Sequence, residues 1–112
     1  MTTKMYRQGD VLVVETKERP ASAKPVPRDA GRVILAYGEV TGHAHALTDK
    51  RATLYRDDGA GSGGRTFLSI APGDPAELQH EEHSTIPLPG GKDYEVIIQR
   101  EYSPAEIRNV AD

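Results

Sequence analysis

A chain of 112 residues in which only 5% are aromatic has room for one domain with a thin core, and not for two domains. It contains no cysteine, which excludes disulfides, thiolate metal sites and cysteine nucleophiles. Its formal net charge of −3 argues against a nucleic-acid binder that relies on a broad basic face. No stretch resembles a membrane span or a secretion signal, so we expect an intracellular, cytoplasmic protein that does not contact a membrane.

The first half of the chain is predicted to form strands around one long loop. Residues 11–14 are apolar and β-branched, typical of a buried strand entered from a Gly-Asp turn. Residues 16–31 are polar and contain three prolines, which predicts a flexible surface loop. Residues 32–37 form the next expected strand, and residues 40–47 continue extended and carry two histidines.

The second half repeats this pattern of short strands and turns. Strands are expected at 52–56, 66–70 and 94–102, with a flexible glycine-rich connection at 57–65 and a turn at 89–91. A capping box that starts at Ser103 predicts one short helical turn at 106–110. We therefore predict a single all-β domain over residues 1–112, either a small β-barrel or a two-sheet sandwich.

All four histidines of the chain fall into two tight pairs, His43 with His45 and His80 with His83. Residues two apart on a strand point to the same face, so the first pair presents two imidazoles side by side. Imidazole is the commonest protein ligand for metals, and metal sites often draw ligands from two segments. We predict a divalent metal site made by these four histidines. The alternatives are a hydrogen-bonded network of histidines and carboxylates, or solvent-exposed polar residues.

The second pair leaves the ligand set open. His80 and His83 are three residues apart, so on a regular strand they would point to opposite faces. Strand parity then places His80 and Glu82 inward. A turn or bulge after Glu81 would bring His83 to the site instead of Glu82, or beside it. We favour His83 as the fourth ligand.

Nitrogen and oxygen ligands without sulfur suit Zn²⁺, Fe²⁺, Mn²⁺ or Ni²⁺. Four protein ligands would close the site and make it structural, whereas three ligands and a water would leave a position for a reaction. In the open case Glu82, or Glu81 beside it, is a candidate catalytic base. The equal alternative is that these glutamates orient an imidazole, and Glu39 and Asp49 are candidates for the same supporting part.

The segment Gly42-His43-Ala44-His45, followed by Asp49, resembles the first motif of cupins, in which glycine precedes His-x-His and a glutamate follows. His80 is similar to the later cupin histidine. This resemblance implies a cupin-like barrel and a metal held by three histidines and one carboxylate. The chain departs from the pattern in having aspartate for glutamate, no Pro-x-Gly at the usual interval before His80, and the additional His83.

The whole chain also resembles a group of short bacterial proteins of uncharacterised function. The shared features are the opening Arg-Gln-Gly-Asp-Val, Gly-Glu-Val-Thr-Gly-His-Ala-His and His-Glu-Glu-His. That likeness implies no activity.

Two functional hypotheses follow. The first is a small histidine-rich metalloprotein that could act as a cupin-like metalloenzyme on a small-molecule substrate. The second is a non-enzymatic accessory module, in which a structural metal stabilises the thin core and the loops bind a protein partner. In either case thin β domains often pair, so a homodimer is expected.

Overall fold

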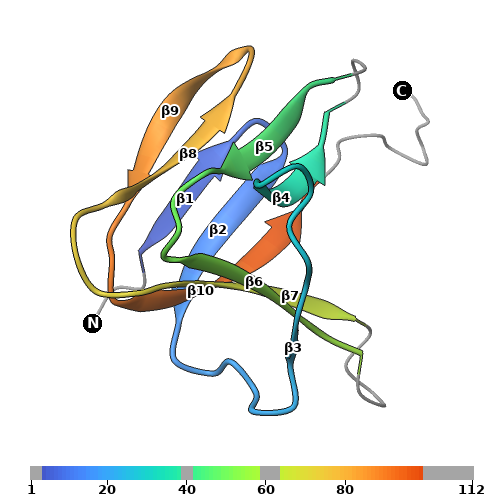
Figure 1. Cartoon of the computed structure of the whole chain (residues 1–112), viewed down its shortest axis with the longest axis vertical. Helices are drawn as coiled ribbons and strands as arrows, with labels where there is room; N and C mark the ends of the chain where they lie inside the picture. Colours follow the sequence, from blue (N-terminus) through green and yellow to red (C-terminus); the bar gives the residue numbers. More distant parts are fainter. Residues whose placement is uncertain (1–3, 39–41, 59–63, 100–112) are drawn as a thin grey trace, which may run out of the picture.

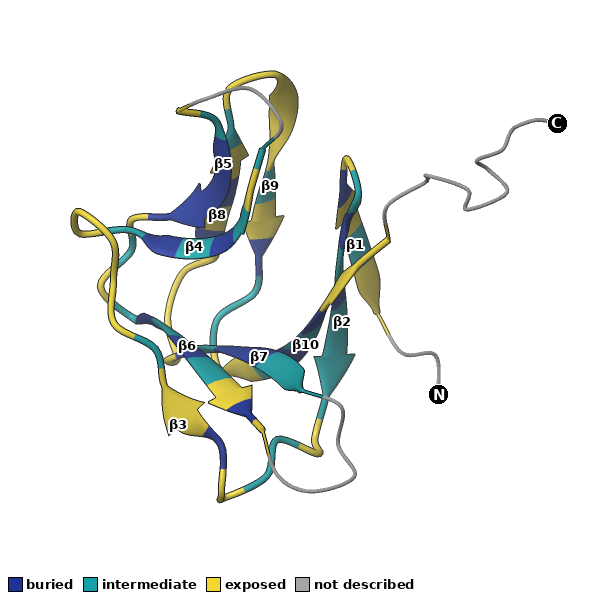
Figure 2. Ribbon diagram, turned by 90° about the vertical axis from the view of Figure 1, so that its right-hand side faces the viewer, coloured by how far each residue is buried: buried dark blue, intermediate teal, exposed yellow. Residues whose placement is uncertain are grey.

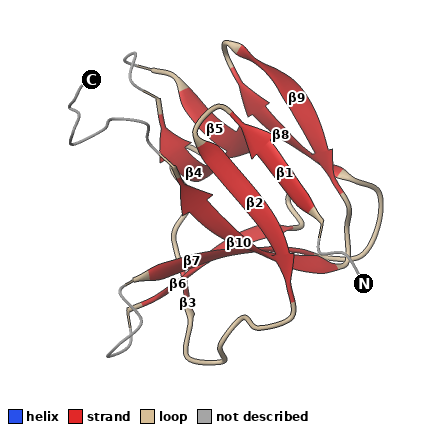
Figure 3. Ribbon diagram, turned by 180° about the vertical axis from the view of Figure 1, so that it is seen from behind, coloured by secondary structure: helices blue, strands red, loops and turns tan. Residues whose placement is uncertain are grey.

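The computed structural model describes residues 4–38, 42–58 and 64–99, and within them the chain forms ten strands and no helix (Figures 1 and 3). The strands are β1 (Met5–Gln8), β2 (Val11–Thr16), β3 (Lys24–Pro25), β4 (Val33–Tyr37), β5 (Ala44–Leu47), β6 (Ala52–Asp57), β7 (Arg65–Ile70), β8 (Ala76–His80), β9 (His83–Leu88) and β10 (Lys92–Ile98). The helical turn predicted at 106–110 lies outside the described residues, as does Glu39.

The strands form two antiparallel sheets. One has the order β1-β2-β10-β7-β6-β3 and the other the order β4-β5-β8-β9. Both sheets end in edge strands within the described residues, so the predicted sandwich is found and the closed barrel is not. The six-stranded sheet curves around the four-stranded one, and the buried positions of both sheets face the space between them (Figure 2).

One apolar core fills the space between the sheets. The six-stranded sheet contributes Val11, Val13 and Tyr94, which are fully buried, and the other sheet contributes Leu47 and Leu78. Period-two alternation explains this division, because every second residue of β2 points inward. With no tryptophan in the chain, branched aliphatic side chains make up most of this core.

The predicted loop at 16–31 contains one strand that the sequence analysis did not predict. Lys24 and Pro25 form β3 at the edge of the six-stranded sheet, paired with β6. Proline is tolerated there because an edge strand needs donors toward only one neighbour. Arg28 fastens the end of this loop, since its guanidinium donates to the carbonyl oxygens of Asp49 at 2.6 Å and Ala52 at 2.8 Å. Of the predicted connection at 57–65, residues 59–63 lie outside the described part.

Residues 76–83, for which a regular strand and a turn after Glu81 were both open, form one strand of a hairpin and its turn. β8 ends at His80, Glu81 and Glu82 form the turn, and β9 begins at His83, so that the two histidines are cross-strand partners. The register shifts just below the turn: Gln79 alone stands opposite two residues of β9. Strand parity does not predict the side-chain directions here, because a turn and a bulge intervene. A turn or bulge after Glu81 was the alternative that the sequence left open.

Candidate metal centre

The structure brings all four histidines together. The ring centroid of His80 lies 4.3 Å from that of His45, 4.6 Å from that of His83 and 5.7 Å from that of His43. The centroids of His45 and His83 are 5.8 Å apart. With Zn–N bonds of 2.0–2.1 Å, imidazole centroids around one tetrahedral ion lie about 5 Å apart. The centroid distances are of this size, and among the described residues the ligand atoms of His43, His80 and Glu81 lie within 4.8 Å of one another.

His45 is held inside the protein by the position of its strand. β5 lies between β4 and β8, and all four of its residues are buried. Alternation turns His45 and Leu47 toward the six-stranded sheet, while Ala44 and Ala46 face the other way. His45 is 3% exposed, whereas the side chain of His43, just before the strand, is 23% exposed. The first pair thus supplies one interior imidazole and one at the rim.

Two glycines let the backbone approach the imidazoles closely. A Cβ on Gly9 would lie 2.8 Å from Nε2 of His83, and Gly9 has a φ of +60°, a conformation that disfavours other residues. A Cβ on Gly38 would lie 2.9 Å from Cβ of His43 and 3.2 Å from Nε2 of His80. Any larger residue at either position would have to displace a member of the histidine cluster.

A buried glutamine orients the imidazole of His45. The side-chain amide of Gln8, which is 2% exposed, donates to the carbonyl oxygens of Leu78 and Ser84, each at 2.9 Å. Because carbonyl oxygens only accept, the Gln8 oxygen must face Nδ1 of His45, 2.8 Å away. His45 Nδ1 is then the donor of this hydrogen bond. Metal-ligating histidines typically have one ring nitrogen held by a polar group of the protein in this way.

A carboxylate faces the other ring nitrogen of His45. Oδ1 of Asp10 lies 3.6 Å from Nε2 of His45. Two ligand atoms on one tetrahedral ion lie about 3.4 Å apart, so both atoms could bind the same cation. Asp10 and Gln8 were not predicted as site residues. Both belong to the opening Arg-Gln-Gly-Asp-Val, which is shared with the short bacterial proteins that the chain resembles.

A second carboxylate lies at the rim. Ligand atoms of His43, His80 and Glu81 lie within 4.8 Å of one another, and this group is more exposed than His45. Oε1 of Glu81 accepts the backbone N–H of Ala44 at 3.0 Å. That hydrogen bond, together with the N–H of Glu81 itself and the nearby His43 and His80, lowers the pKa of the Glu81 carboxyl below its ordinary value.

His80 carries a hydrogen bond that a metal would have to replace. Its Nδ1 lies 3.0 Å from the backbone N–H of Glu82, which donates to it, so the neutral ring carries its own proton on Nε2. A metal bound through Nδ1 would take the lone pair that this turn hydrogen bond uses. Metal binding at Nδ1 would therefore cost the hydrogen bond from Glu82, and binding at Nε2 would displace the proton there.

The remaining predicted site residues lie at its margin. Glu82, the predicted catalytic base, is 61% exposed in its side chain, and its Oε2 lies 3.3 Å from Nδ1 of His43. Asp49, which would complete the cupin motif, is instead held by Arg51, with an Oδ2–Nη2 distance of 2.8 Å and a pKa lowered by that contact. Among the described residues, the carboxylates found beside the histidines are thus Glu81, Glu82 and Asp10.

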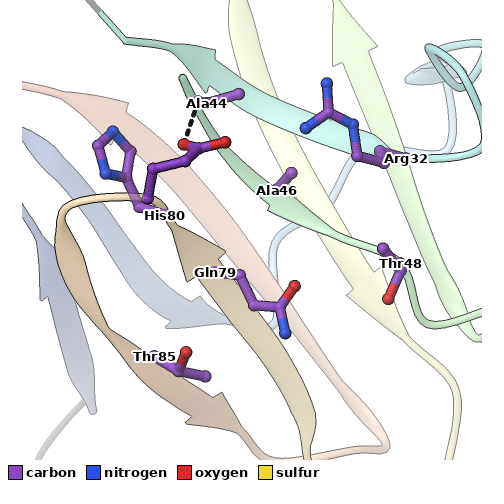
Figure 4. Close-up of a pocket in the computed structure, with 8 residues that line it drawn as sticks. Arg32, Ala44, Ala46, Thr48, Gln79, His80 and Thr85 are labelled. Atoms are coloured by element: carbon purple, nitrogen blue, oxygen red, sulfur yellow. Dashed lines mark hydrogen bonds between the residues drawn. The ribbon is translucent and has the colours of Figure 1, made fainter. Parts of the chain in front are cut away.

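A pocket of about 320 Å³ opens beside the rim group, on the outer face of the four-stranded sheet. Its floor is formed by Ala44 and Ala46, with His80 and Arg32 on either side of them (Figure 4). The other lining residues are Thr48, Gln79, Glu81 and Thr85. The pocket thus combines a floor of small residues with polar side chains around it.

The comparisons with known proteins give a family without a function. A family model described as Domain of unknown function (DUF8820) matches residues 7–99. No curated protein and no solved structure matches the chain. The residues described here include no helix with the length and apolarity that a membrane crossing requires.

Proposed function

The chain belongs to the DUF8820 family, and from the geometry of its histidine cluster we propose that it binds a divalent metal ion, Zn²⁺, Fe²⁺, Mn²⁺ or Ni²⁺. The observation that carries the proposal is the meeting of four imidazoles from two separate hairpins at centroid distances of 4.3 to 5.8 Å. Contacts between imidazole rings alone add little to stability. A shared cation would instead be coordinated by a nitrogen of each ring.

The ligands in this proposal come from both parts of the cluster. His45 would bind through Nε2, because its Nδ1 is hydrogen-bonded to Gln8, and His80, whose ring lies near the other three, would bind beside it. His43 and His83 complete the imidazole set. Asp10 and Glu81 are the carboxylates that would balance the charge of the ion.

A catalytic form of this function is supported by the exposure of the rim. The group of His43, His80 and Glu81 borders a pocket, so an ion held there would keep positions open to water or to a substrate. Glu82, which is exposed beside His43, would then be the catalytic base as the sequence predicts. This form agrees with the cupin-like metalloenzyme hypothesis in chemistry, although its carboxylate would come from Asp10 or Glu81 and not from Asp49.

A structural metal is the second candidate, and a different observation favours it. His45 is buried, and its contacts with Gln8 and Asp10 connect the turn between β1 and β2 to the four-stranded sheet. An ion there would join the two sheets at one end of a small core, as in small metal-stabilised domains. In this form the protein is an accessory module that acts through a protein partner.

Metal titration of the purified chain tests the proposal. After treatment with a chelator, the protein is titrated with Zn²⁺ and Mn²⁺ by calorimetry, and bound metal is counted by mass spectrometry after desalting. We expect one equivalent of metal in the wild type and a loss of about 10-fold or more in affinity for His80→Ala, since losses of this size follow even from weaker perturbations of metal sites. Gln79→Ala, which changes the exposed neighbour on the same strand, is the matched control.

Two outcomes would count against the proposal: no metal retained by the wild type, or equal affinities for His80→Ala and Gln79→Ala. The two candidate forms separate by stability. A structural ion would raise the melting temperature strongly, because binding free energy is then folding free energy. An ion with an open coordination position would instead bind an exogenous ligand such as azide.

A further inference from the structure

The pocket on the outer face of the four-stranded sheet has the shape of a site for a small ligand. On β5 the outward residues are Ala44 and Ala46, whose short side chains leave a depression between the flanking strands. Thr48, Gln79 and Thr85 surround it with two hydroxyls and an amide. A volume of about 320 Å³ is at the small end of the range for ligand sites.

Arg32 supplies a cationic group at one side of this pocket. Its side chain is half-buried, and no carboxylate of the described residues forms an ion pair with it. Other arginines of the chain do have such partners, as Arg51 has Asp49 and Arg65 has Glu95. A guanidinium on the wall of a pocket presents a planar set of donors that matches a carboxylate.

The other side of the pocket is the rim of the metal centre. His80 and Glu81 both line the pocket and both belong to the group whose ligand atoms lie within 4.8 Å. An ion at that rim would place a second positive charge within reach of a ligand that contacts Arg32 (Figure 4).

We propose that this pocket binds a small organic diacid, with one carboxylate on Arg32 and the other on the metal ion held at His80 and Glu81. This inference deepens the proposed metal function and rests on it. The short floor and polar walls leave room for the few atoms between the two carboxylates, and the threonines and Gln79 would hydrogen-bond to them.

Charge makes the binding of metal and diacid interdependent. Without an ion, the Glu81 carboxylate repels an anion that enters the pocket. With an ion bound, that charge is neutralised and the free coordination position attracts the second carboxylate. Because such coupling is reciprocal, the diacid also raises the affinity for the metal.

Calorimetric titration with diacids of increasing length tests this. Malonate, succinate and glutarate are titrated into zinc-loaded, desalted protein and into chelator-treated protein, with propionate as the monoacid. We expect one of the diacids to bind the loaded protein at least about 10-fold more tightly than propionate does, and the chelator-treated protein to bind none of them, because each charge-assisted contact contributes a factor of this order.

Substitution of the arginine separates the pocket from the metal site. Arg32→Gln should leave the zinc affinity measured without diacid unchanged and should weaken diacid binding about 10-fold or more. Arg32→Lys should have an intermediate diacid affinity, because lysine keeps the charge but lacks the paired guanidinium donors. Arg56→Gln, which removes the same charge from β6 outside the pocket, is the matched control and should bind like the wild type.

The failures of the two proposals are distinguishable. A zinc-loaded protein that binds none of the diacids, or an Arg32→Gln variant that binds them as the wild type does, overturns the pocket assignment and leaves the metal function intact. A protein that takes up no metal overturns both.

Discussion

Replacing Gln8 with leucine tests the link between the core and the histidine cluster. Leucine has a similar volume but forms no hydrogen bonds. It would leave the carbonyl oxygens of Leu78 and Ser84 and the Nδ1–H of His45 without the partner that each has now. The contacts to Leu78 and His45 are buried, whereas the one to Ser84 is partly open to water.

The expected loss of stability follows from these three contacts. Each buried group left unpaired costs about 1–3 kcal/mol, so the two buried ones together cost about 2–6 kcal/mol. Burial of the apolar leucine side chain offsets roughly 1–2 kcal/mol of this. We expect the free energy of unfolding to fall by about 3 kcal/mol, or the melting temperature by about 12 °C in a domain of this size.

Urea denaturation in the presence of a chelator measures the free energy of unfolding without metal. Zinc titration of the folded variant measures its affinity for the ion. Since a lost outer partner of a ligating histidine typically weakens metal binding 10- to 100-fold, we expect a loss in about that range. Gln79→Leu makes the same chemical change at an exposed position of β8 and should stay within about 0.5 kcal/mol of the wild type. A Gln8→Leu protein as stable as Gln79→Leu would refute the hydrogen-bond network described here.

Three further outcomes are expected. Gly9→Ala and Gly31→Ala both introduce backbone strain of about 1 kcal/mol at a positive φ, but only Gly9→Ala places a Cβ 2.8 Å from Nε2 of His83. Calorimetry should therefore show weakened zinc binding for Gly9→Ala alone. Equal zinc affinities of the two variants would contradict the contact with His83. The pKa of Asp49 is lowered from its ordinary 3.8 by hydrogen bonds from the arginine two residues later. Its stabilisation is thus complete above pH 4 and lost as the pH falls through the lower folded-state value, so Asp49→Asn should flatten the stability profile in acid denaturation between pH 4 and 2. Burial raises the pKa of Tyr94 above its ordinary 10.0, so its contribution is present below pH 10 and lost at higher pH. Tyr94→Phe should cost about 1 kcal/mol at neutral pH through the hydroxyl's lost bond to a backbone carbonyl, and should reduce the alkaline loss of stability seen by denaturation at pH 9 and 11.

The strands were predictable because their signal is local. Residues 11–14, 52–56 and 66–70 alternate or cluster apolar side chains between turn residues, and each lies in a strand of the structure. The choice between sandwich and barrel was not predictable, since it depends on which edges pair at long range. β3 was missed because a lysine followed by a proline gives no strand signal when only one neighbouring strand supplies the hydrogen bonds.

The histidines of the candidate site were predictable from the sequence, whereas the residue that orients one of them was not. Pairing of His43 with His45 and of His80 with His83 is visible in the sequence, and the structure brings the two pairs together. The contribution of Gln8 was not predictable from the sequence. It depends on a carbonyl group and an imidazole that other strands place around the glutamine side chain. The metal and its chemistry stay predictions.

The two-residue turn between β8 and β9 has a consequence for sequence variation. Because His80 and His83 are paired across it, adding or removing one residue there would rotate one imidazole to the opposite side of the sheet. Relatives that keep the same chemistry should therefore vary in length elsewhere, such as in the connection between β6 and β7, while the interval between these two histidines stays constant. A relative with a longer tip would have to draw its nitrogen donors from another strand.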